Sequence, residues 1–159
     1  MLSRREFLKL CLSSAALTLS GVLLPQVVEA LEGRGEKVVL IWLEMMTCSG
    51  DLISFLNTLR PDIIQLIQDT LQLEYQNTLM VAEGDKALNH LFDVAKGEEG
   101  KFILVAEGTV PTRDGGFFGH VGYFQDGREV TDIDALKYLG PKAKHIIAIG
   151  TCASFGGPY

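Results

Sequence analysis

Continuous apolar runs of strand length constrain the fold of this chain more than any other feature. They are VVLIWLE at 38–44, KFILVAEG at 101–108 and HIIAIG at 145–150. Such runs, rich in β-branched residues and without polar alternation, predict strands buried on both faces of a parallel sheet. The segment LEYQNTLMVA at 73–82 predicts a further strand.

Segments with helical spacing of apolar residues separate these strands. One helix is predicted from Asp51 until Pro61 interrupts it, and others at 62–71, 84–97 and 132–140. The residues expected to face the core are Leu52, Phe55, Leu56, Leu59, Ile63, Ile64, Ile67, Leu71, Leu88, Leu91, Phe92 and Ala95. The Gly-rich stretch 109–131 predicts a long loop with a small hairpin around Asp126-Gly127. The alternation of strand and helix predicts an α/β fold, an open parallel sheet wrapped by helices.

The first thirty residues predict an export signal. SRREFLK, with Arg4 and Arg5, precedes an uncharged run at 10–28 and small residues near Ala30. This order resembles a twin-arginine signal at 1–30, followed by a linker at 31–37. An uncleaved membrane anchor remains open, because the run is long enough to span a bilayer. If the signal is cleaved, Cys11 leaves with it, and the mature protein is periplasmic or lies at the outer face of the cytoplasmic membrane.

The length and charge of the chain favour a single domain that does not bind nucleic acid. The chain has 159 residues, 47% of them hydrophobic, and a net charge of -6. One domain with a real core suits this length. No block of Lys or Arg follows residue 9, which argues against a nucleic-acid partner, since phosphate binding needs clustered positive charge.

Candidate ligands follow three of the predicted strands. Cys48 and Asp51 come after the first strand, Glu107 ends the third, and Cys152 follows the fourth. Ligands of open α/β sheets bind beyond the carboxyl ends of the strands, so these side chains are expected at one rim. Thiolates there could bind iron-sulfur clusters or zinc. The residues alone leave open a disulfide between Cys48 and Cys152, an inert Cys152, and a helix-capping role for Asp51.

Four motifs carry a family resemblance. WLEMMTCSGD, LEYQNTLM, VAEGTVPTRDGGFFG and GTCASFGG occur in this order behind the export signal. Together they resemble the small subunit of a nickel-iron hydrogenase and, more weakly, the iron-sulfur subunit of respiratory complex I. The resemblance covers essentially all of 38–157 and implies a flavodoxin-like domain at 38–159 with helices on both faces. It also implies that this domain is incomplete here, before the C-terminal cluster-binding region.

The resemblance implies a ligand set for a proximal 4Fe-4S cluster. By position, the ligands are Cys48, Asp51 and Cys152, with a fourth ligand expected from a later Cys. Asp51 departs from the family pattern, which usually has Cys there; a hard oxygen ligand is expected to shift the cluster's potential. Glu44 and Glu107 are expected beside the cluster and do not ligate it. Further clusters are expected only in the C-terminal part.

The implied function is electron transfer. Electrons from hydrogen oxidation in a nickel-iron large subunit would pass through the proximal cluster to a membrane acceptor such as a cytochrome b. The chain alone is expected to be inactive. An apolar docking surface is predicted around Met45, Met46, Phe117 and Phe118, and His120 is predicted to make a local hydrogen bond. The alternatives are an exported flavodoxin-like domain without a cluster, with its two cysteines in a disulfide, and a complex I-like subunit.

Overall fold

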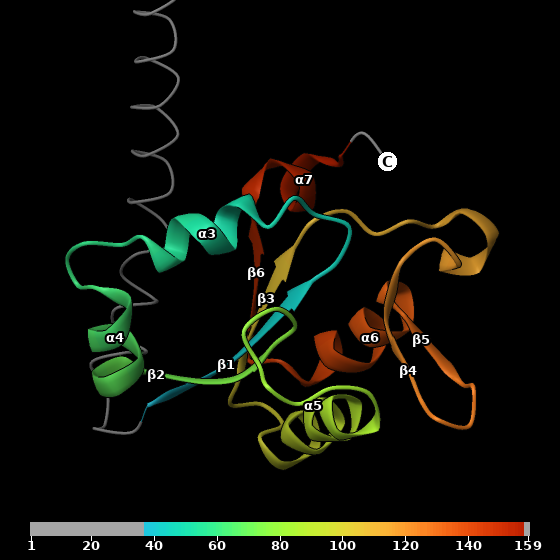
Figure 1. Ribbon diagram of the computed structural model, residues 1–159, viewed down its shortest axis with the longest axis horizontal. Helices are drawn as coiled ribbons and strands as arrows, with labels where there is room; N and C mark the ends of the chain where they lie inside the picture. Colours follow the sequence, from blue (N-terminus) through green and yellow to red (C-terminus); the bar gives the residue numbers. More distant parts are fainter. Residues whose placement is uncertain (1–36, 158–159) are drawn as a thin grey trace, which may run out of the picture. The chain divides into compact units, whose positions relative to one another are not determined.

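In the computed structural model, which describes residues 37–157, four parallel strands form a sheet in the order β2-β1-β3-β6 (Figure 1). Their bounds are β1 (Val38–Glu44), β2 (Leu71–Gln76), β3 (Ile103–Glu107) and β6 (His145–Ile149). The register runs from Leu40 opposite Ile103 to Glu44 opposite Glu107. The parallel sheet predicted from the apolar runs is thus confirmed, and the carboxyl ends of β1 and β3 end level with each other.

Helices cover both faces of this sheet. The helices α5 (Asp85–Gly97) and α6 (Asp132–Leu139) pack on one face, and α3 (Gly50–Leu56) packs on the other (Figure 1). The side chains of β1 alternate accordingly: Ile41 and Leu43 belong to the first core cluster, Leu40 and Trp42 to the second. This is the period-two alternation of a strand buried on both sides. A short helix, α7 (Gly150–Phe155), follows β6.

The second strand differs from its prediction at both ends. It was expected at 73–82 but begins at Leu71, where it pairs with Val38 of β1, and ends at Gln76. The buried Gln76 ends it, because its Oε1 accepts hydrogen bonds from the backbone N–H groups of Thr78 and Leu79, at 2.7 and 2.6 Å. The side chain thereby bends the backbone into a turn.

The segment after Pro61 is only partly helical. It forms α4 (Ile63–Gln65) and a π-helical turn, η1 (Leu66–Thr70), and Asp62 caps α4 in a capping box with Gln65. The predicted inward face is wrong here. Ile64 and Ile67 are 63% and 38% exposed, and Leu59 is 87% exposed. The two helical pieces are too short to present a continuous row of apolar side chains to the sheet. The apolar residues at helical spacing are therefore left largely exposed.

The Gly-rich stretch contains the predicted hairpin. The strands β4 (His120–Tyr123) and β5 (Glu129–Thr131) pair antiparallel. Before them lies a 3-10 turn, η2 (Arg113–Gly116); a second one, η3 (Gly140–Lys142), follows α6. Thr131 caps α6 by accepting a hydrogen bond from the Asp134 N–H. The predicted signal at 1–30 lies outside the described residues. Among those described, no helix is both long and apolar enough to cross a membrane.

Candidate functional site

The segments after β1, β3 and β6 meet at the carboxyl end of the sheet. Beyond the paired strands, Met46 and Thr109 exchange backbone hydrogen bonds of 3.2 and 2.9 Å. Gly108 permits this close approach. It has φ +94°, and a Cβ there would lie 2.6 Å from the Met46 carbonyl oxygen. The loop that follows β1 and the loop that follows β3 are therefore held together at this rim.

Cys48 and Asp51 lie on either side of the start of α3. Cys48 is exposed and is a free thiol. Ser49, in the left-handed conformation with φ 57°, is the N-cap residue, and no side chain caps this helix. The open possibility of Asp51 as the cap is therefore wrong; its side chain lies inside the first turn.

The carboxylate of Asp51 reaches the helix that follows β6. It lies against Gly150, the first residue of α7, so closely that a Cβ on Gly150 would overlap Oδ2. Gly150 has φ +77°, which glycine adopts without strain. Cys152 lies two residues later on the same helix, half-buried and also a free thiol. The predicted convergence of the first-strand and fourth-strand loops is present, and the disulfide alternative is not.

Each of the three candidate ligands has a glycine against its donor atom. A Cβ on Gly50 would come 3.2 Å from the Sγ of Cys48, and one on Gly157 would come 3.3 Å from the Sγ of Cys152. Gly150 stands in the same relation to Asp51. The donor atoms of all three candidate ligands therefore lie directly against backbone that carries no side chain.

Within residues 37–157, no three His, Cys, Asp or Glu side chains converge tightly enough to hold one metal ion. The arrangement therefore does not match a mononuclear site such as tetrahedral zinc, whose ligands crowd around a single centre. The donors are instead distributed over the rim.

Glu107 is completely buried at the end of β3. Its Oε2 accepts a hydrogen bond of 2.8 Å from the indole N–H of Trp42, and its Oε1 accepts one of 3.1 Å from the Thr47 hydroxyl. The Thr47 oxygen accepts in turn from the N–H of Ser49, at 3.2 Å. This chain of bonds connects the core directly to the turn that carries Cys48.

Glu44, the other acidic residue predicted near the site, is buried at the end of β1. Its Oε2 accepts from the Gln76 amide at 2.6 Å and from the Thr78 hydroxyl. Its Oε1 has no partner among the described residues. Asn77 bonds to the backbone of Glu44 in both directions, at 3.2 and 2.9 Å. Glu44 thus organises the turn after β2.

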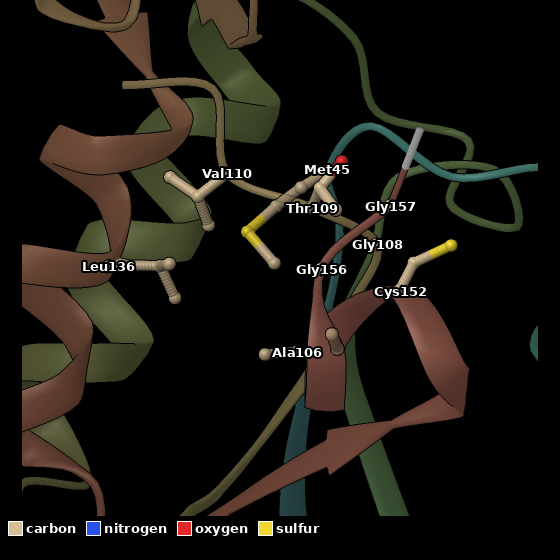
Figure 2. Close-up of a pocket in the computed structure, with 10 residues that line it drawn as sticks. Met45, Ala106, Gly108, Thr109, Val110, Leu136, Cys152, Gly156 and Gly157 are labelled. Atoms are coloured by element: carbon tan, nitrogen blue, oxygen red, sulfur yellow. The ribbon is translucent and has the colours of Figure 1, made fainter. Parts of the chain in front are cut away.

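A cavity of about 330 Å³ lies beside Cys152, between α6, α7 and the ends of β1 and β3. Figure 2 shows the side chains of Met45, Val110 and Leu136 gathered on one side of it, and the Cys152 thiol pointing away from them. One side of the cavity is thus lined by apolar side chains, while Cys152 borders it with its thiol directed away from them.

The predicted apolar docking surface is only partly exposed. Phe117 and Phe118 are 58% and 56% exposed and contact each other edge to face, with ring centroids 5.6 Å apart. Met45 packs against the core and lines the cavity, and Met46 is half-buried. His120 makes the predicted local hydrogen bond, with its Nε2 3.0 Å from Oε2 of Glu129.

Residues that the sequence reasoning did not select also shape the rim. They are Thr47, Gln76, Asn77, Thr78 and Thr109, whose polar side chains hold the loops described above. The sequence held one sign that such partners exist. Buried polar groups need hydrogen-bond partners, and the buried strands contain Trp42, Glu44, Gln76 and Glu107.

Comparison with known proteins matches the chain to one family model and to small subunits of hydrogenases. A family model described as NADH ubiquinone oxidoreductase, 20 Kd subunit, matches residues 48–159. The chain is 37% identical to a periplasmic NiFeSe hydrogenase small subunit of Desulfomicrobium baculatum, over 98% of this chain and 51% of that protein. It is 34% identical to the uptake hydrogenase small subunit of Azotobacter vinelandii, over 98% of this chain and 42% of that protein.

Solved structures agree with these matches. A reduced, active form of the Ni-Fe-Se hydrogenase of Desulfomicrobium baculatum aligns with TM-score 0.75 and 35% identity, over 77% of this chain and 45% of that chain. An actinobacterial-type NiFe-hydrogenase of Ralstonia eutropha H16 aligns with TM-score 0.66 and 26% identity, over 77% of this chain and 38% of that chain. The predicted α/β fold is the fold of hydrogenase small subunits. The chain spans about half the length of the curated relatives it matches.

Proposed function

The chain belongs to the family described as NADH ubiquinone oxidoreductase, 20 Kd subunit, and from this premise we propose that it is the cluster-holding part of an electron-transfer subunit of a nickel-iron hydrogenase. The observation that carries the proposal is the set of donor side chains at the carboxyl end of the sheet. Two free thiols and a carboxylate lie on the segments that converge there, at the turn after β1 and in the first turns of α3 and α7, each donor against a glycine. The hydrogenase small subunits among the relatives support the choice of enzyme.

The donor set fits a proximal 4Fe-4S cluster. Cys48, Asp51 and Cys152 would each bind one iron, and a fourth ligand would come from a segment outside these residues. A cluster distributes its ligands over several irons, so the absence of a tight three-ligand group within 37–157 is compatible with it. When bound, the cluster accepts and releases single electrons.

The surrounding residues would position these ligands. The bonds from Trp42 through Glu107 and Thr47 to Ser49 fix the turn that holds Cys48. Asp51 is set by its contact with Gly150. Because Asp51 supplies a hard oxygen donor in place of sulfur, it would favour the more oxidised iron and shift the reduction potential. Both carboxylate oxygens of Glu107 and Oε2 of Glu44 are occupied by bonds to the protein, which suits the positioning roles proposed for them.

The partner under this proposal is a nickel-iron large subunit, where hydrogen would be oxidised. Phe117 and Phe118 would contribute to the docking surface, since exposed aromatic pairs are typical of interfaces. Export by the twin-arginine route, from the Arg4-Arg5 motif, would place the protein in the periplasm or at the outer face of the cytoplasmic membrane. The electron acceptor would be a membrane protein such as a cytochrome b.

A second candidate is an iron-sulfur subunit of the complex I type, which the description of the matching family favours. It would use the same rim and the same cluster chemistry. The hydrogenase relatives align over 98% of the chain, including most of the export motif region, whereas the family model begins at residue 48. We therefore place the hydrogenase assignment first.

Anaerobic iron and acid-labile sulfide analysis, with electron paramagnetic resonance, tests the proposal. The protein that also carries the segment with the fourth ligand is expected to hold iron and sulfide in roughly equal amounts. The signal should be lost or altered in Cys48→Ala and Cys152→Ala and kept in Cys11→Ala, the matched control outside the site. If that extended protein holds no iron, or if its cluster survives both rim substitutions, the assignment is ruled out.

A further inference from the structure

The aromatic loop, residues 113–119, rests on the first residues of α6. Gly116 lies so close to Ile133 that a Cβ there would come 2.8 Å from Cδ1 of that side chain. The carbonyl oxygen of Gly119 accepts a hydrogen bond of 3.0 Å from the N–H of Asp132. The base of the loop is therefore fixed to α6, while Phe117 and Phe118 extend outward and are exposed.

Asp132 is an unusual residue to find under this loop. It is 2% exposed, and its Oδ2 is buried without a hydrogen-bond partner among the described residues. That oxygen faces the Cα of Gly119, where a Cβ would overlap it. Pro111 closes the same space, since the added Cβ would also lie 2.6 Å from its Cγ. A charged carboxylate enclosed in this way lacks both water and a donor, which is costly.

The charged groups around Asp132 do little to offset the cost of burying its carboxylate. His120 of β4 is near enough for its charge to favour the carboxylate, but its Nε2 is bonded to Glu129 of β5. Asp134 of α6 bonds to Thr131. In the loop itself, Arg113 pairs with Asp114, 3.5 Å away at the exposed turn. Burial therefore dominates and raises the pKa of Asp132 from 3.8 to about 6, against the smaller lowering effect of His120.

We propose that Asp132 is a proton-controlled positioning residue for the aromatic loop: its neutral carboxyl lets the loop close on α6, and its ionisation loosens the loop. Ionisation has this effect because the charged Oδ2 gains water only when Gly119 and Pro111 move away. The loop carries Phe117 and Phe118, so the proton on Asp132 also sets how well their surface is ordered for docking. This last consequence rests on the proposed function; the loop movement does not.

Hydrogen exchange of the chain, without iron or partner, tests the loop movement. The reporters are the N–H groups of Gly119, bonded to the Gly116 carbonyl at 3.0 Å, and of Asp132. After correction for intrinsic exchange rates, their protection is expected to fall about tenfold from pH 5 to pH 8, the change that linkage to this pKa gives. Amides of β3 serve as the internal reference for global stability.

The variants separate the proton of Asp132 from other effects. Asp132→Asn, which stays neutral, is expected to keep the reporters protected at both pH values, whereas Asp134→Asn should keep the pH dependence. Gly119→Ala should loosen the loop at both pH values and tests the geometry even if Asp132→Asn fails to fold. Equal wild-type protection at pH 5 and pH 8, or a pH dependence that persists in Asp132→Asn, would overturn the proposal. Because no cluster is involved, either result is independent of the hydrogenase assignment.

Discussion

The indole N–H of Trp42 in β1 donates a 2.8 Å hydrogen bond to Oε2 of Glu107 at the end of β3, a side chain with no exposed surface. The bond ties two neighbouring strands through their side chains, in addition to the backbone ladder. Since the same carboxylate also holds Thr47, the core of the sheet and the turn before Cys48 are mechanically connected. Substitutions of Trp42 or Glu107 should therefore also alter the turn that carries Cys48.

Replacing Glu107 tests this connection. In Glu107→Leu, the Trp42 N–H and the Thr47 hydroxyl both lose a buried acceptor, so the free energy of unfolding should fall by about 1–3 kcal/mol. Glu107→Gln keeps one acceptor oxygen and should cost less. Urea unfolding followed by the fluorescence of Trp42, the one tryptophan of the chain, measures both. Equal losses in the two variants would mean that the hydrogen bonds contribute little.

Gly150→Ala should displace Asp51, because the new Cβ would overlap Oδ2 of that carboxylate. Iron content after anaerobic preparation is expected to fall. Gly127→Ala is the matched control. Its φ is +85°, close to the +77° of Gly150, but nothing lies within 4 Å of its added Cβ. Both variants should lose about 1–2 kcal/mol of stability from backbone strain, and only Gly150→Ala should lose iron.

Asp51→Cys should retain a cluster with a different reduction potential, since a soft sulfur replaces a hard oxygen on one iron. Potentiometric titration followed by electron paramagnetic resonance gives the comparison. Asp62→Cys, which changes the cap of α4 instead, is the control and should leave the potential unchanged. A potential and spectrum in Asp51→Cys identical to those of the wild type would show that Asp51 does not coordinate iron.

Export should depend on the paired arginines. Replacing Arg4 and Arg5 together by Lys is expected to leave the precursor in the cytoplasm, because the twin-arginine route reads that pair. Cell fractionation followed by immunoblotting measures the distribution. Arg34→Lys makes the same chemical change outside the motif and should be exported normally. Normal export of the double variant would remove the support for this route.

Stability should fall as the pH rises through about 6. The pKa of Asp132 is raised from 3.8 to about 6 by burial, so the folded protein binds this proton more tightly than the unfolded chain. The stabilisation is complete below pH 3.8 and is lost as the pH rises through 6. At pH 7.5, Asp132→Asn should therefore be more stable than the wild type by about 1–3 kcal/mol, and the difference should shrink toward pH 4. Urea unfolding of both proteins across this pH range measures the difference in stability. A difference that does not change with pH would contradict the assignment of the effect to ionisation of Asp132.

The order of elements and the place of the site could be predicted from the sequence alone. Runs such as VVLIWLE can only be buried on both sides, so a parallel sheet covered by helices follows from them. The carboxyl ends of parallel strands share one edge, and this placed Cys48 and Cys152 at the same rim without any knowledge of coordinates. Both conclusions rest on local patterns that the backbone must satisfy.

Contacts between distant segments were decided by the tertiary structure. Asp51 could have been a cap, yet the path of α7 brings Gly150 against its carboxylate. Gln76 ends β2 through its own side chain, and Ile64 is exposed despite its helical spacing. The enclosure of Asp132 under Gly119 likewise depends on how a long loop folds back. Burial and hydrogen bonding of such residues depend on neighbours far away in the chain, and no local pattern encodes those neighbours.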